Sequence, residues 1–475
     1  MNKNNSPVIY WLRSDFRMYD NIALNEAVKN NQKVILVYFY NYLSKVSNKL
    51  TAENVWAEKS LNEINSQFKE KYNIEIYRYN DDPKDIFKNM YNLFGISKVY
   101  YNRIYEPKII KSDSLIENFF ASKIIFESYN SSLLFEPMSI KNNSGSYFKV
   151  YTPFWKNSLT KLLLRQPLKP PKSINSFKSK KLLKNNISIK TESKWIKEIL
   201  EYFKPGEIEA RKKLTKLGKL ITDYSKYRDF PIYNKTSQFS PYFARGELSV
   251  NEVMFHLVKN KNKIKKNDFL KFTSQLGWRE FSYNILNNFP ELAHKNFNKK
   301  FDDFKWEKNE INFSKWKKGK TGYPIIDAGM RELWTTGYMH NRIRMVVASF
   351  LVKDLFIDWR KGREWFAKTL FDHDNANNAA GWQWVAGSGT DAAPYFRIFN
   401  PILQSERFDS DGKYIRKWVP ELNKLPHKFI HAPWKLENDT LKKYNVVLGK
   451  TYPYPIVDHG KSRDKALMLY KSLGK

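Results

Sequence analysis

The sequence of 475 residues contains no cysteine and no long uninterrupted run of apolar residues. Without cysteine, disulfides, a thiolate nucleophile, cysteine-ligated zinc and iron–sulfur clusters are all excluded. No stretch reaches the roughly eighteen apolar residues of a membrane-spanning helix, and the first residues lack the basic segment and apolar core of a signal peptide. We therefore expect a soluble, cytoplasmic protein with no membrane partner.

Acidic residues are scarce relative to basic ones. The chain has 48 Asp and Glu against 82 Lys and Arg, a formal net charge of +34. Such an excess predicts a polyanionic partner, because Lys and Arg that neutralise phosphates release counterions. Part of the excess has a second explanation, since Lys- and Asn-rich runs such as 259–266 are typical of a low-GC bacterial genome. Nucleic acid is favoured over a membrane surface.

Aromatic residues are abundant, with 14 Trp, 29 Tyr and 33 Phe. A core of this size needs fewer, whereas stacking on bases or on a cofactor ring would use them. The aromatic content therefore favours a ligand with flat rings.

The first part of the chain predicts an α/β domain. Residues 7–130 alternate short β-branched or aromatic runs with amphipathic stretches, which is typical of βαβ units and a parallel sheet. Expected strands are 8–12, 34–40, 74–78, 98–101 and 123–126, and expected helices are 53–71, 83–94 and 110–120. No GxGxxG motif follows the first strand, so the dinucleotide fingerprint is absent.

The rest of the chain predicts a connector and then helices. Residues 131–200 are rich in Ser, Asn, Lys and Pro, whereas from 193 onward nearly every stretch has a helical pattern. Helix-start and helix-stop signals are a capping box at 249–252, Pro241, Pro324 and Gly337. The expected organisation is a Rossmann-like α/β domain (1–130), a long connector (131–200) and an all-α domain (201–475).

The densest group of functional residue types lies at 372–384. Two carboxylates, three asparagines and two tryptophans alternate there with Ala and Gly, a pattern typical of a close-packed ligand wall. A divalent-metal site around Asp372, His373 and Asp374 is an alternative. Hard cations prefer several carboxylates without tryptophan neighbours, so we expect no metal.

Three further segments are candidate sites. Residues 236–240 offer hydroxyls before Pro241, which suits an anionic group such as a diphosphate, although a simple helix cap by Ser240 explains them as well. The segment 275–281 combines Gln, Trp, Arg and Glu. Residues 340–344 place arginines at the start of an apolar helix, where Asp372 or Asp374 would pair with them if they are buried; a solvated basic helix start is the alternative.

Several motifs resemble those of the photolyase/cryptochrome family, and most closely its class I cyclobutane pyrimidine dimer photolyases. They are WREF (278–281), TGYP (321–324), DAGM (327–330), MHNR (339–342), NN (377–378), GWQW (381–384) and DAAPYFRIFNP (391–401). The resemblance extends from RSDFR (13–17) to PIVD (455–458) in family order, so it covers nearly the whole chain.

The resemblance implies a folded FAD in the helical domain. The residues implied to bind it are Tyr224, Thr236, Ser237, Gln238, Phe239, Ser240, Arg279, Asn341, Arg344, Asp372, His373, Asp374 and Asn378. Asn378 would lie near the flavin N5, where a neutral amide does not readily deliver a proton, so the reduced anionic flavin that donates the electron is easier to keep.

The family also implies an electron relay of Trp382, Trp359 and Trp306 from the flavin to the surface. Indole is readily oxidised, so closely spaced rings can pass a hole outward. Each tryptophan taken alone, without the resemblance, is explained better by core packing.

The implied substrate is UV-damaged DNA. The damaged pair must leave the duplex, which costs a few kcal/mol and costs less for a poorly stacked lesion. Trp278 and Trp384 would sandwich it. The other residues implied to contact the lesion or its backbone are Gln275, Asn341, Arg342, Met345, Arg397 and Gln404. Light-driven electron transfer then splits the dimer, in a protein expected to act as a monomer.

Some positions depart from the family pattern. Gln275 stands where cyclobutane-dimer enzymes have Glu and is familiar from (6-4) photolyases, but Asn341 and Met345 replace the histidines of that branch. A second antenna chromophore is expected without an assigned identity, because the residues after Glu106 lack the carboxylate of folate-binding relatives. A blue-light signalling cryptochrome is the alternative from another class, and Asn378 favours repair over it.

Overall fold

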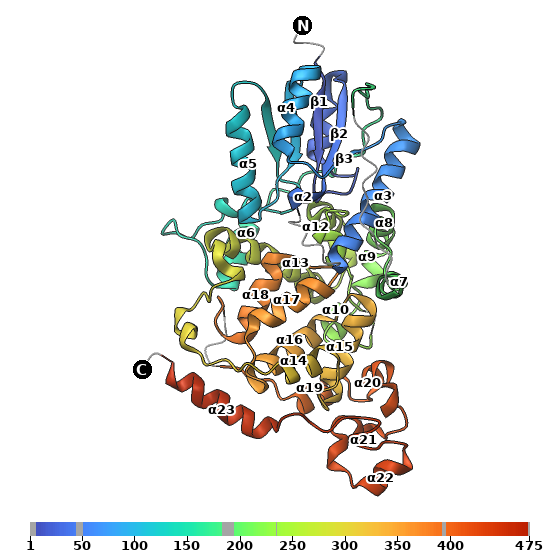
Figure 1. Cartoon of the computed structure of the whole chain (residues 1–475), viewed down its shortest axis with the longest axis vertical. Coiled ribbons are helices and arrows are strands. Elements are labelled where there is room, and N and C mark those ends of the chain that lie inside the picture. The colour runs from blue at the N-terminus through green and yellow to red at the C-terminus, as the bar shows by residue number, and fades with distance from the viewer. Residues whose placement is uncertain (1–5, 44–50, 183–193, 234, 392–395, 474–475) are drawn as a thin grey trace.

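The computed structural model describes residues 6–43, 51–182, 194–233, 235–391 and 396–473. An α/β layer occupies one end of an elongated molecule, and helices fill the rest (Figure 1). Within these described ranges, no helix is both long and apolar enough to cross a bilayer.

The α/β part is built on five parallel strands in the order β3-β2-β1-β4-β5. They are β1 (Val8–Leu12), β2 (Val34–Phe39), β3 (Tyr77–Tyr79), β4 (Lys98–Asn102) and β5 (Ile125–Tyr129). All five expected strands exist, but β3 and β5 begin later than expected. The backbone N–H groups of Ile74 and Ile124 bond to Phe68 and Phe120 respectively, so each closes the end of the preceding helix instead of pairing in the sheet.

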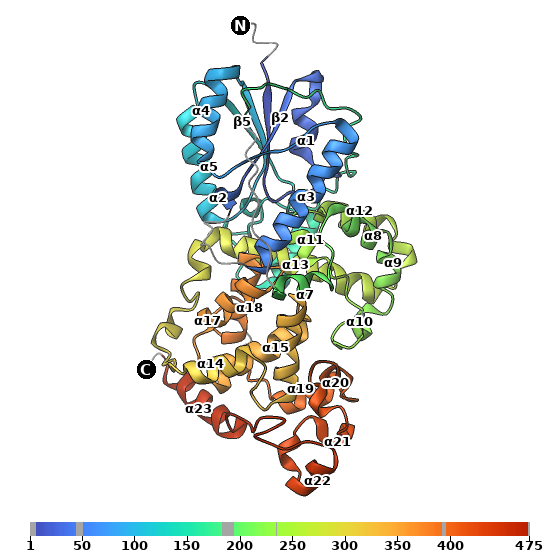
Figure 2. The ribbon, with the colours of Figure 1, turned by 45° about the vertical axis from the view of Figure 1, so that its right-hand side comes forward.

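Both faces of the sheet are covered, as the sequence pattern predicts for parallel strands. Val8, Tyr10 and Leu12 of β1 pack into the cluster beneath α1 (Ile22–Ala27) and α3 (Ala52–Tyr72). The alternate residues Ile9 and Trp11 pack toward α4 (Pro83–Phe94) and α5 (Pro107–Phe120). Figure 2 shows these two layers on opposite sides of the strands. The remaining short helices of this part are η2 (Lys29–Asn31) and α2 (Tyr40–Leu43).

Residues 131–182 contain a helix that the sequence analysis did not predict, α6 (Tyr151–Thr160), after the short η3 (Pro137–Ser139). Its aromatic residues Tyr151, Phe154 and Trp155 are buried against α13 (Lys266–Asn288). Tertiary packing, rather than an amphipathic repeat, therefore stabilises this helix. Further on, Ser176 forms a bridge with Val34, so the chain returns to the sheet before α7 (Lys194–Leu200).

Helices make up the remainder of the described chain. The α-helices not yet named are α8 (Glu207–Thr215), α9 (Leu217–Leu220), α10 (Tyr224–Tyr227), α11 (Ser240–Ala244), α12 (Val250–Lys259), α14 (Glu310–Lys317), α15 (Pro324–Thr336), α16 (Asn341–Ser349), α17 (Trp359–Thr369), α18 (Asn375–Ala386), α19 (Pro401–Phe408), α20 (Lys413–Trp418), α21 (His427–Ile430), α22 (Asn438–Lys443) and α23 (His459–Ser472). Short 3-10 turns are η4 (Lys261–Lys263), η5 (Pro290–Ala293), η6 (Lys299–Asp303), η8 (Pro420–Leu422) and η9 (Pro433–Lys435), and η7 (Phe350–Asp354) is a π-helix.

The expected helix ends are confirmed. Ser249 accepts a hydrogen bond from the backbone N–H of Glu252 and caps α12. Pro241 and Pro324 lie in the first turns of α11 and α15, and Gly337 ends α15 with a φ of 67°. These local signals depend on neighbouring residues only, which is why the sequence reveals them.

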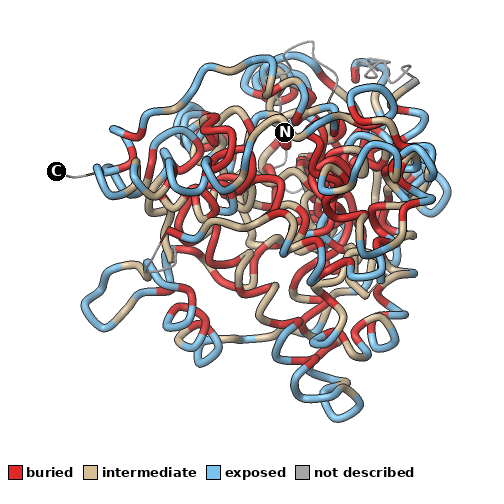
Figure 3. Tube along the Cα trace, turned by 90° about the horizontal axis from the view of Figure 1, so that it is seen from below, coloured by how far each residue is buried: buried red, intermediate tan, exposed pale blue. Residues whose placement is uncertain are grey.

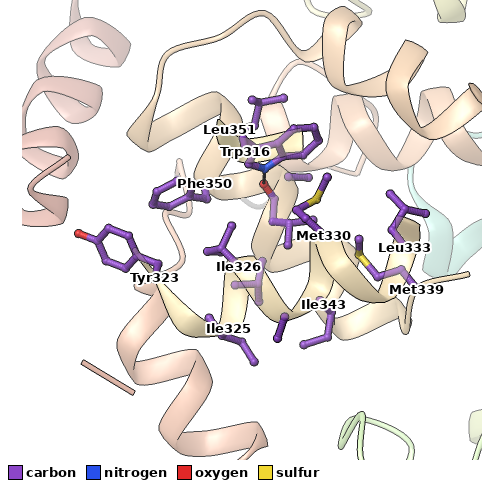
Figure 4. Packing of buried hydrophobic residues seen from close by; sticks show 14 of the residues in the cluster. Trp316, Tyr323, Ile325, Ile326, Met330, Leu333, Met339, Ile343, Phe350 and Leu351 are labelled. Carbon is purple, nitrogen blue, oxygen red and sulfur yellow. Dashed lines mark hydrogen bonds between the residues drawn. The ribbon is translucent and has the colours of Figure 1, made fainter. Parts of the chain in front are cut away.

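The largest core cluster fixes the helices that carry the candidate site (Figure 4). Trp316 lies at its centre and donates its indole N–H to the backbone oxygen of Val347 in α16, at 3.0 Å. Gly329 lets α15 approach closely, because a Cβ there would lie 2.3 Å from Ile343. Seen from below, buried residues fill the interior and exposed ones lie mainly on peripheral loops (Figure 3). The start of α16 is therefore rigidly placed.

Candidate active site

Asp372 joins three segments that are far apart in the sequence. Its Oδ2 accepts a hydrogen bond from Ser240 Oγ at 2.6 Å and pairs with Nη2 of Arg344 at 2.8 Å. Arg344 Nε also donates to the backbone oxygen of Met339 at 2.7 Å, which orients the guanidinium. The beginning of α11, the beginning of α16 and the loop before α18 thus meet at one carboxylate.

The Arg344–Asp372 ion pair is one of the two pairings expected from the sequence. Burial alone would lower the pKa of Arg344, but the nearby carboxylate of Asp372 outweighs it and raises that pKa. Ser240 is the first residue of α11 and makes no N-cap bond; its hydroxyl bonds Asp372 instead. The capping explanation of Ser240 is therefore wrong.

The residues before α11 lie beside this junction. Thr236 lies near enough to Tyr338 to lower the pKa of its hydroxyl, against the larger effect of burial, and the Tyr338 ring lies 5.3 Å from the guanidinium of Arg344. Gln238 adopts a left-handed φ of 53°, and its Oε1 accepts a hydrogen bond from Lys213 Nζ at 2.9 Å. A weak bond of 3.4 Å links the backbone N–H of Phe239 to Ser237 Oγ. Tyr224 is buried in the same cluster as Phe239.

Asp374 and Asn378 are fixed at the start of α18. Asp374 caps this helix by accepting from the backbone N–H of Asn377 at 2.8 Å, and Tyr283 donates its hydroxyl to the other carboxylate oxygen. Asn378 Nδ2 donates to the backbone oxygen of Arg363 at 3.1 Å. This bond uses one of the two amide N–H groups, so the side-chain oxygen and the second N–H of Asn378 are left for another partner.

Asp372 Oδ1 and Trp382 Nε1 are two of the buried polar atoms that have no hydrogen-bond partner among the described residues. An unpaired buried polar group costs about 1–3 kcal/mol. Native proteins seldom leave such a group unsatisfied without a function or a missing ligand. One free acceptor and one free donor therefore indicate that a polar ligand completes this part of the structure.

His373 faces the α/β domain. Its Nδ1 lies 2.7 Å from Glu53 Oε2 in α3, and Glu53 Oε1 pairs with Arg245 at 2.8 Å. Burial would raise the pKa of Glu53, but Arg245 and His373 outweigh it and lower that pKa to about 2. Burial would lower the pKa of His373, but the carboxylate of Glu53 outweighs burial and raises it. A charged clamp thus ties the segment 372–374 to the α/β domain.

A cleft of about 1590 Å³ lies beside this clamp. Its lining includes Arg279, His373 and Asp374 of the expected cofactor residues, together with Tyr105 and Glu106 of the α/β domain. Burial raises the pKa of Glu106 to about 7, and the carboxyl accepts a hydrogen bond from Asn375 at 2.9 Å. The cleft is large enough for a small aromatic molecule between the two domains.

The two tryptophans expected at the substrate are each held by a specific contact. The ring of Trp278 stacks on Tyr151 at a centroid distance of 3.8 Å and an interplanar angle of 10°. Trp384 donates its indole N–H to the backbone oxygen of Asp391 at 3.1 Å. Both rings are only partly buried, so part of each remains available to a ligand.

The three tryptophans expected in the relay have different surroundings. Trp382 lies against Phe366, with ring centroids 5.0 Å apart, and against Gly362 of α17, the helix that begins at Trp359. Trp359 is fully buried and donates to Asn296 Oδ1 at 2.9 Å. Trp306 lies 4.4 Å from Phe304. These contacts are compatible with core packing and with a relay, so the relay stays a prediction.

The remaining expected substrate residues do not form one contact network. Arg342 pairs with Asp229 at 3.2 Å, not with Asp372 or Asp374, and lies over Phe408. Asn341 lies near Met345 on the exposed side of α16. Gln275 bonds the backbone of Lys271 in its own helix. Gln404 has a buried, unpaired Oε1 and Arg397 is exposed, while residues 392–395 of the DAAPYFRIFNP motif lie outside the described residues.

Sequence analysis missed four residues that shape the site: Glu53, Tyr151, Tyr283 and Arg363. None belongs to a motif that the analysis used, and their partners are 15 to 320 positions away along the chain. Only the Tyr283 position, one turn after Arg279 on the same helix, could have been inferred from helical spacing.

Comparisons with known proteins identify the chain's relatives. Residues 8–172 match the family model "DNA photolyase", and residues 272–472 match "FAD binding domain of DNA photolyase". The deoxyribodipyrimidine photo-lyase of Agrobacterium fabrum is 43% identical over 482 aligned residues, which cover 100% of both chains.

Two solved structures extend the comparison. A bacterial class III photolyase from Agrobacterium tumefaciens superposes with a TM-score of 0.92 at 42% identity, covering 99% of this chain and 98% of the other. An archaeal photolyase from Sulfolobus tokodaii, solved with two FAD molecules, has a TM-score of 0.81 at 29% identity, covering 98% and 99%. The class I assignment expected from the motifs stays a prediction beside this class III neighbour. The full-length relative and the two family models show that the chain belongs to the photolyase/cryptochrome family.

Proposed function

We propose that this chain is a deoxyribodipyrimidine photo-lyase, which uses FAD and light to split cyclobutane pyrimidine dimers in DNA. The observation that carries the proposal is the junction at Asp372, where Ser240 and Arg344 converge and one buried carboxylate oxygen stays unpaired. The full-length similarity to a photo-lyase supports the same activity. Residues 1–130 would form the antenna domain, 131–200 the connector and 201–475 the catalytic domain.

The residues present fit FAD. Asp372 offers a free acceptor for a ring N–H group, and Arg344 supplies positive charge beside it. Thr236, Ser237 and Ser240 offer hydroxyls to a ribityl chain or diphosphate, and Tyr224 and Gln238 belong to the same wall. When bound and reduced, FAD supplies the excited electron for ring splitting and takes it back afterwards.

Asn378 has a separate role in this proposal. One of its amide N–H groups donates to the Arg363 backbone and fixes the side chain, and an amide neither gains nor loses a proton at neutral pH. The residue therefore orients a ring nitrogen without protonating it. Trp382, Trp359 and Trp306 would return the flavin to its reduced state.

At the substrate side, Trp278 and Trp384 would enclose the flipped dimer, with Gln275, Asn341 and Met345 near it. Arg342, Arg397 and Gln404 would contact the lesion or its phosphates. The protein would act as a monomer on DNA in the cytoplasm. The cleft lined by Glu106 and Arg279 is a place for a second chromophore, whose identity we leave open.

Photorepair tests this function directly. Purified, photoreduced protein is mixed with an oligonucleotide that carries one cyclobutane thymine dimer, and dimer content is measured by chromatography in blue light and in the dark. We expect dimer loss in light only, and loss of this activity in Trp384→Ala. Trp334→Phe, an exposed tryptophan on another helix, is the matched control.

Two outcomes would count against the proposal. If FAD binds and is photoreduced but the dimer persists, repair of the cyclobutane lesion is wrong, and the (6-4) lesion is tested next because Gln275 occurs in that branch. Failure on both lesions would favour signalling over repair.

A further inference from the structure

Tyr151 covers one face of Trp278. The two rings are nearly parallel, and the Tyr151 hydroxyl donates to the backbone oxygen of Ser274, one turn earlier on α13, at 2.9 Å. The edge of Trp278 meets Phe281, with centroids 5.8 Å apart. No other ring stacks on Trp278 within the described ranges, so its second face is the one available to a ligand.

Gly277 permits this arrangement. A Cβ at this position would lie 2.6 Å from the ring of Trp155 and 2.8 Å from the Tyr151 hydroxyl oxygen. Helices α6 and α13 therefore cross at close range here, and the stack on Trp278 depends on that crossing. The stacked pair is a product of tertiary packing and has little freedom to shift.

Asp391 connects this pair with the second tryptophan. Its backbone oxygen accepts the indole N–H of Trp384, and its carboxyl lies near the start of α6, where the backbone of Tyr151 opposes the rise in the pKa of Asp391 that burial causes. Asp391 has a φ of 52°, in the left-handed region, so its two polar groups are directed by an unusual backbone conformation. One residue thus holds Trp384 directly and lies beside Tyr151, which stacks on Trp278.

We propose that Tyr151 and Asp391 are positioning residues that set the spacing and orientation of Trp278 and Trp384. The inference rests on the proposed function, in which these two tryptophans enclose the flipped dimer. Stacking weakens quickly as two rings separate, so a change in the gap lowers affinity for the lesion. Affinity for undamaged DNA depends on phosphate contacts and should change little.

Two pairs of variants separate positioning from general stability. Tyr151→Leu removes the stacked ring, whereas Tyr151→Phe keeps the ring and loses only the hydroxyl. Asp391→Gly keeps the left-handed backbone and removes the carboxylate, whereas Asp391→Asn keeps an acceptor at the same place. All are measured as full-length protein with bound FAD.

The primary measurement is the preference for dimer-containing over undamaged DNA, obtained in the dark by fluorescence anisotropy. We expect Tyr151→Leu and Asp391→Gly to lower this ratio by about tenfold, of the order expected when one base-stacking contact is lost. Tyr151→Phe and Asp391→Asn should stay within about twofold of wild type. FAD content and the rate of photoreduction should not change in any of the four.

A double-mutant cycle tests whether Tyr151 acts through Trp278. In a Trp278→Ala background, Tyr151→Leu should cause no further loss of preference, because the ring that it supports is gone. An additive loss would overturn the inference, as would an unchanged ratio in Tyr151→Leu. If Tyr151→Leu does not fold, the test rests on Asp391→Gly. A preference of Asp391→Gly for dimer-containing DNA equal to that of wild type would then overturn the inference.

Failure of the proposed function gives a different result. In that case wild type itself shows no preference for the dimer. The near-ultraviolet circular dichroism of the Tyr151–Trp278 stack still tests the positioning, because stacked rings contribute a signal that Tyr151→Leu removes and Tyr151→Phe largely retains. An unchanged spectrum in Tyr151→Leu would then overturn the inference by itself.

Discussion

At the scale of single residues, buried carboxyl groups without a cation stand out. Glu247 is 1% exposed, and it accepts the indole N–H of Trp56 at 2.9 Å and the backbone N–H of Gly206 at 2.6 Å. Burial raises its pKa to about 8. The hydroxyl of Ser60 is within hydrogen-bond reach of both the Trp56 backbone oxygen and the Glu247 carboxyl, and its single proton can be donated to only one of them at a time.

We predict that Glu247→Gln becomes relatively more stable as pH rises. The folded-state pKa of about 8 lies above the ordinary value of 4.5, so folding takes up a proton between these pH values. The unfolding free energy of wild type therefore falls as pH rises from about 4.5 to about 8, and the loss is complete above that. Glutamine does not ionise, so the variant does not lose this part of its unfolding free energy as pH rises.

Melting curves of both proteins between pH 5 and pH 9 test this. The melting temperature of the variant relative to wild type should rise by roughly 2 °C or more across the range. A constant difference would show that Glu247 is ionised in the folded protein. Other buried carboxyls such as Glu332, whose pKa burial raises to about 7, affect both proteins equally.

At the scale of elements, helices α17 and α18 pack so closely that position 362 of α17 requires glycine. A Cβ at Gly362 would lie 2.1 Å from the ring of Trp382. Gly381 on α18 is the opposite case, with nothing within 4 Å of the corresponding position. The same substitution at the two sites therefore has opposite expected effects.

Gly362→Ala should destabilise the protein by about 1–3 kcal/mol, because Trp382 must move to admit the methyl group. Gly381→Ala should stabilise by about 0.5–1 kcal/mol through helix propensity. Chemical denaturation measures both. If Trp382 is the first member of the relay, only Gly362→Ala should also slow photoreduction of FAD; equal stability of the two variants would contradict the close contact.

At the scale of the whole molecule, the chain carries a net charge of +34, whereas the two residues proposed to enclose the dimer, Trp278 and Trp384, are uncharged aromatic residues. The positive charge and the stacking contacts should therefore affect different properties of DNA binding. Phosphate contacts determine overall affinity for DNA and its dependence on salt. The uncharged contacts determine discrimination between damaged and undamaged DNA.

We expect affinity for any DNA to fall by at least about 100-fold between 50 and 200 mM salt, while the lesion preference changes by less than about twofold. Fluorescence anisotropy titrations with matched damaged and undamaged duplexes measure both quantities. Weak salt dependence would instead attribute the positive charge to the composition of the genome. A preference that collapses with salt would contradict aromatic recognition.

Much of the architecture was predictable because its signals are local. The bounds of β1 and α4 were expected from a β-branched and aromatic run and from an amphipathic stretch, respectively, and both agree with the structure. The partner of Arg344 was narrowed to Asp372 or Asp374, since a buried guanidinium requires an anion, and the structure has Asp372. Arg342 shows where this reasoning ends: its partner Asp229 could not be selected from the sequence without knowing which helices meet.

The sequence by itself determined the two-part architecture, the family motifs, the exclusion of cysteine chemistry and the charge that favours a polyanion. These properties depend on composition and on periodicities of a few residues. Tertiary structure alone decided that α6 exists, that Tyr151 stacks on Trp278, and that Glu53 pairs with His373 across 320 positions of sequence. Contacts of this kind depend on where whole helices cross, and a crossing is set by the packing of the entire core.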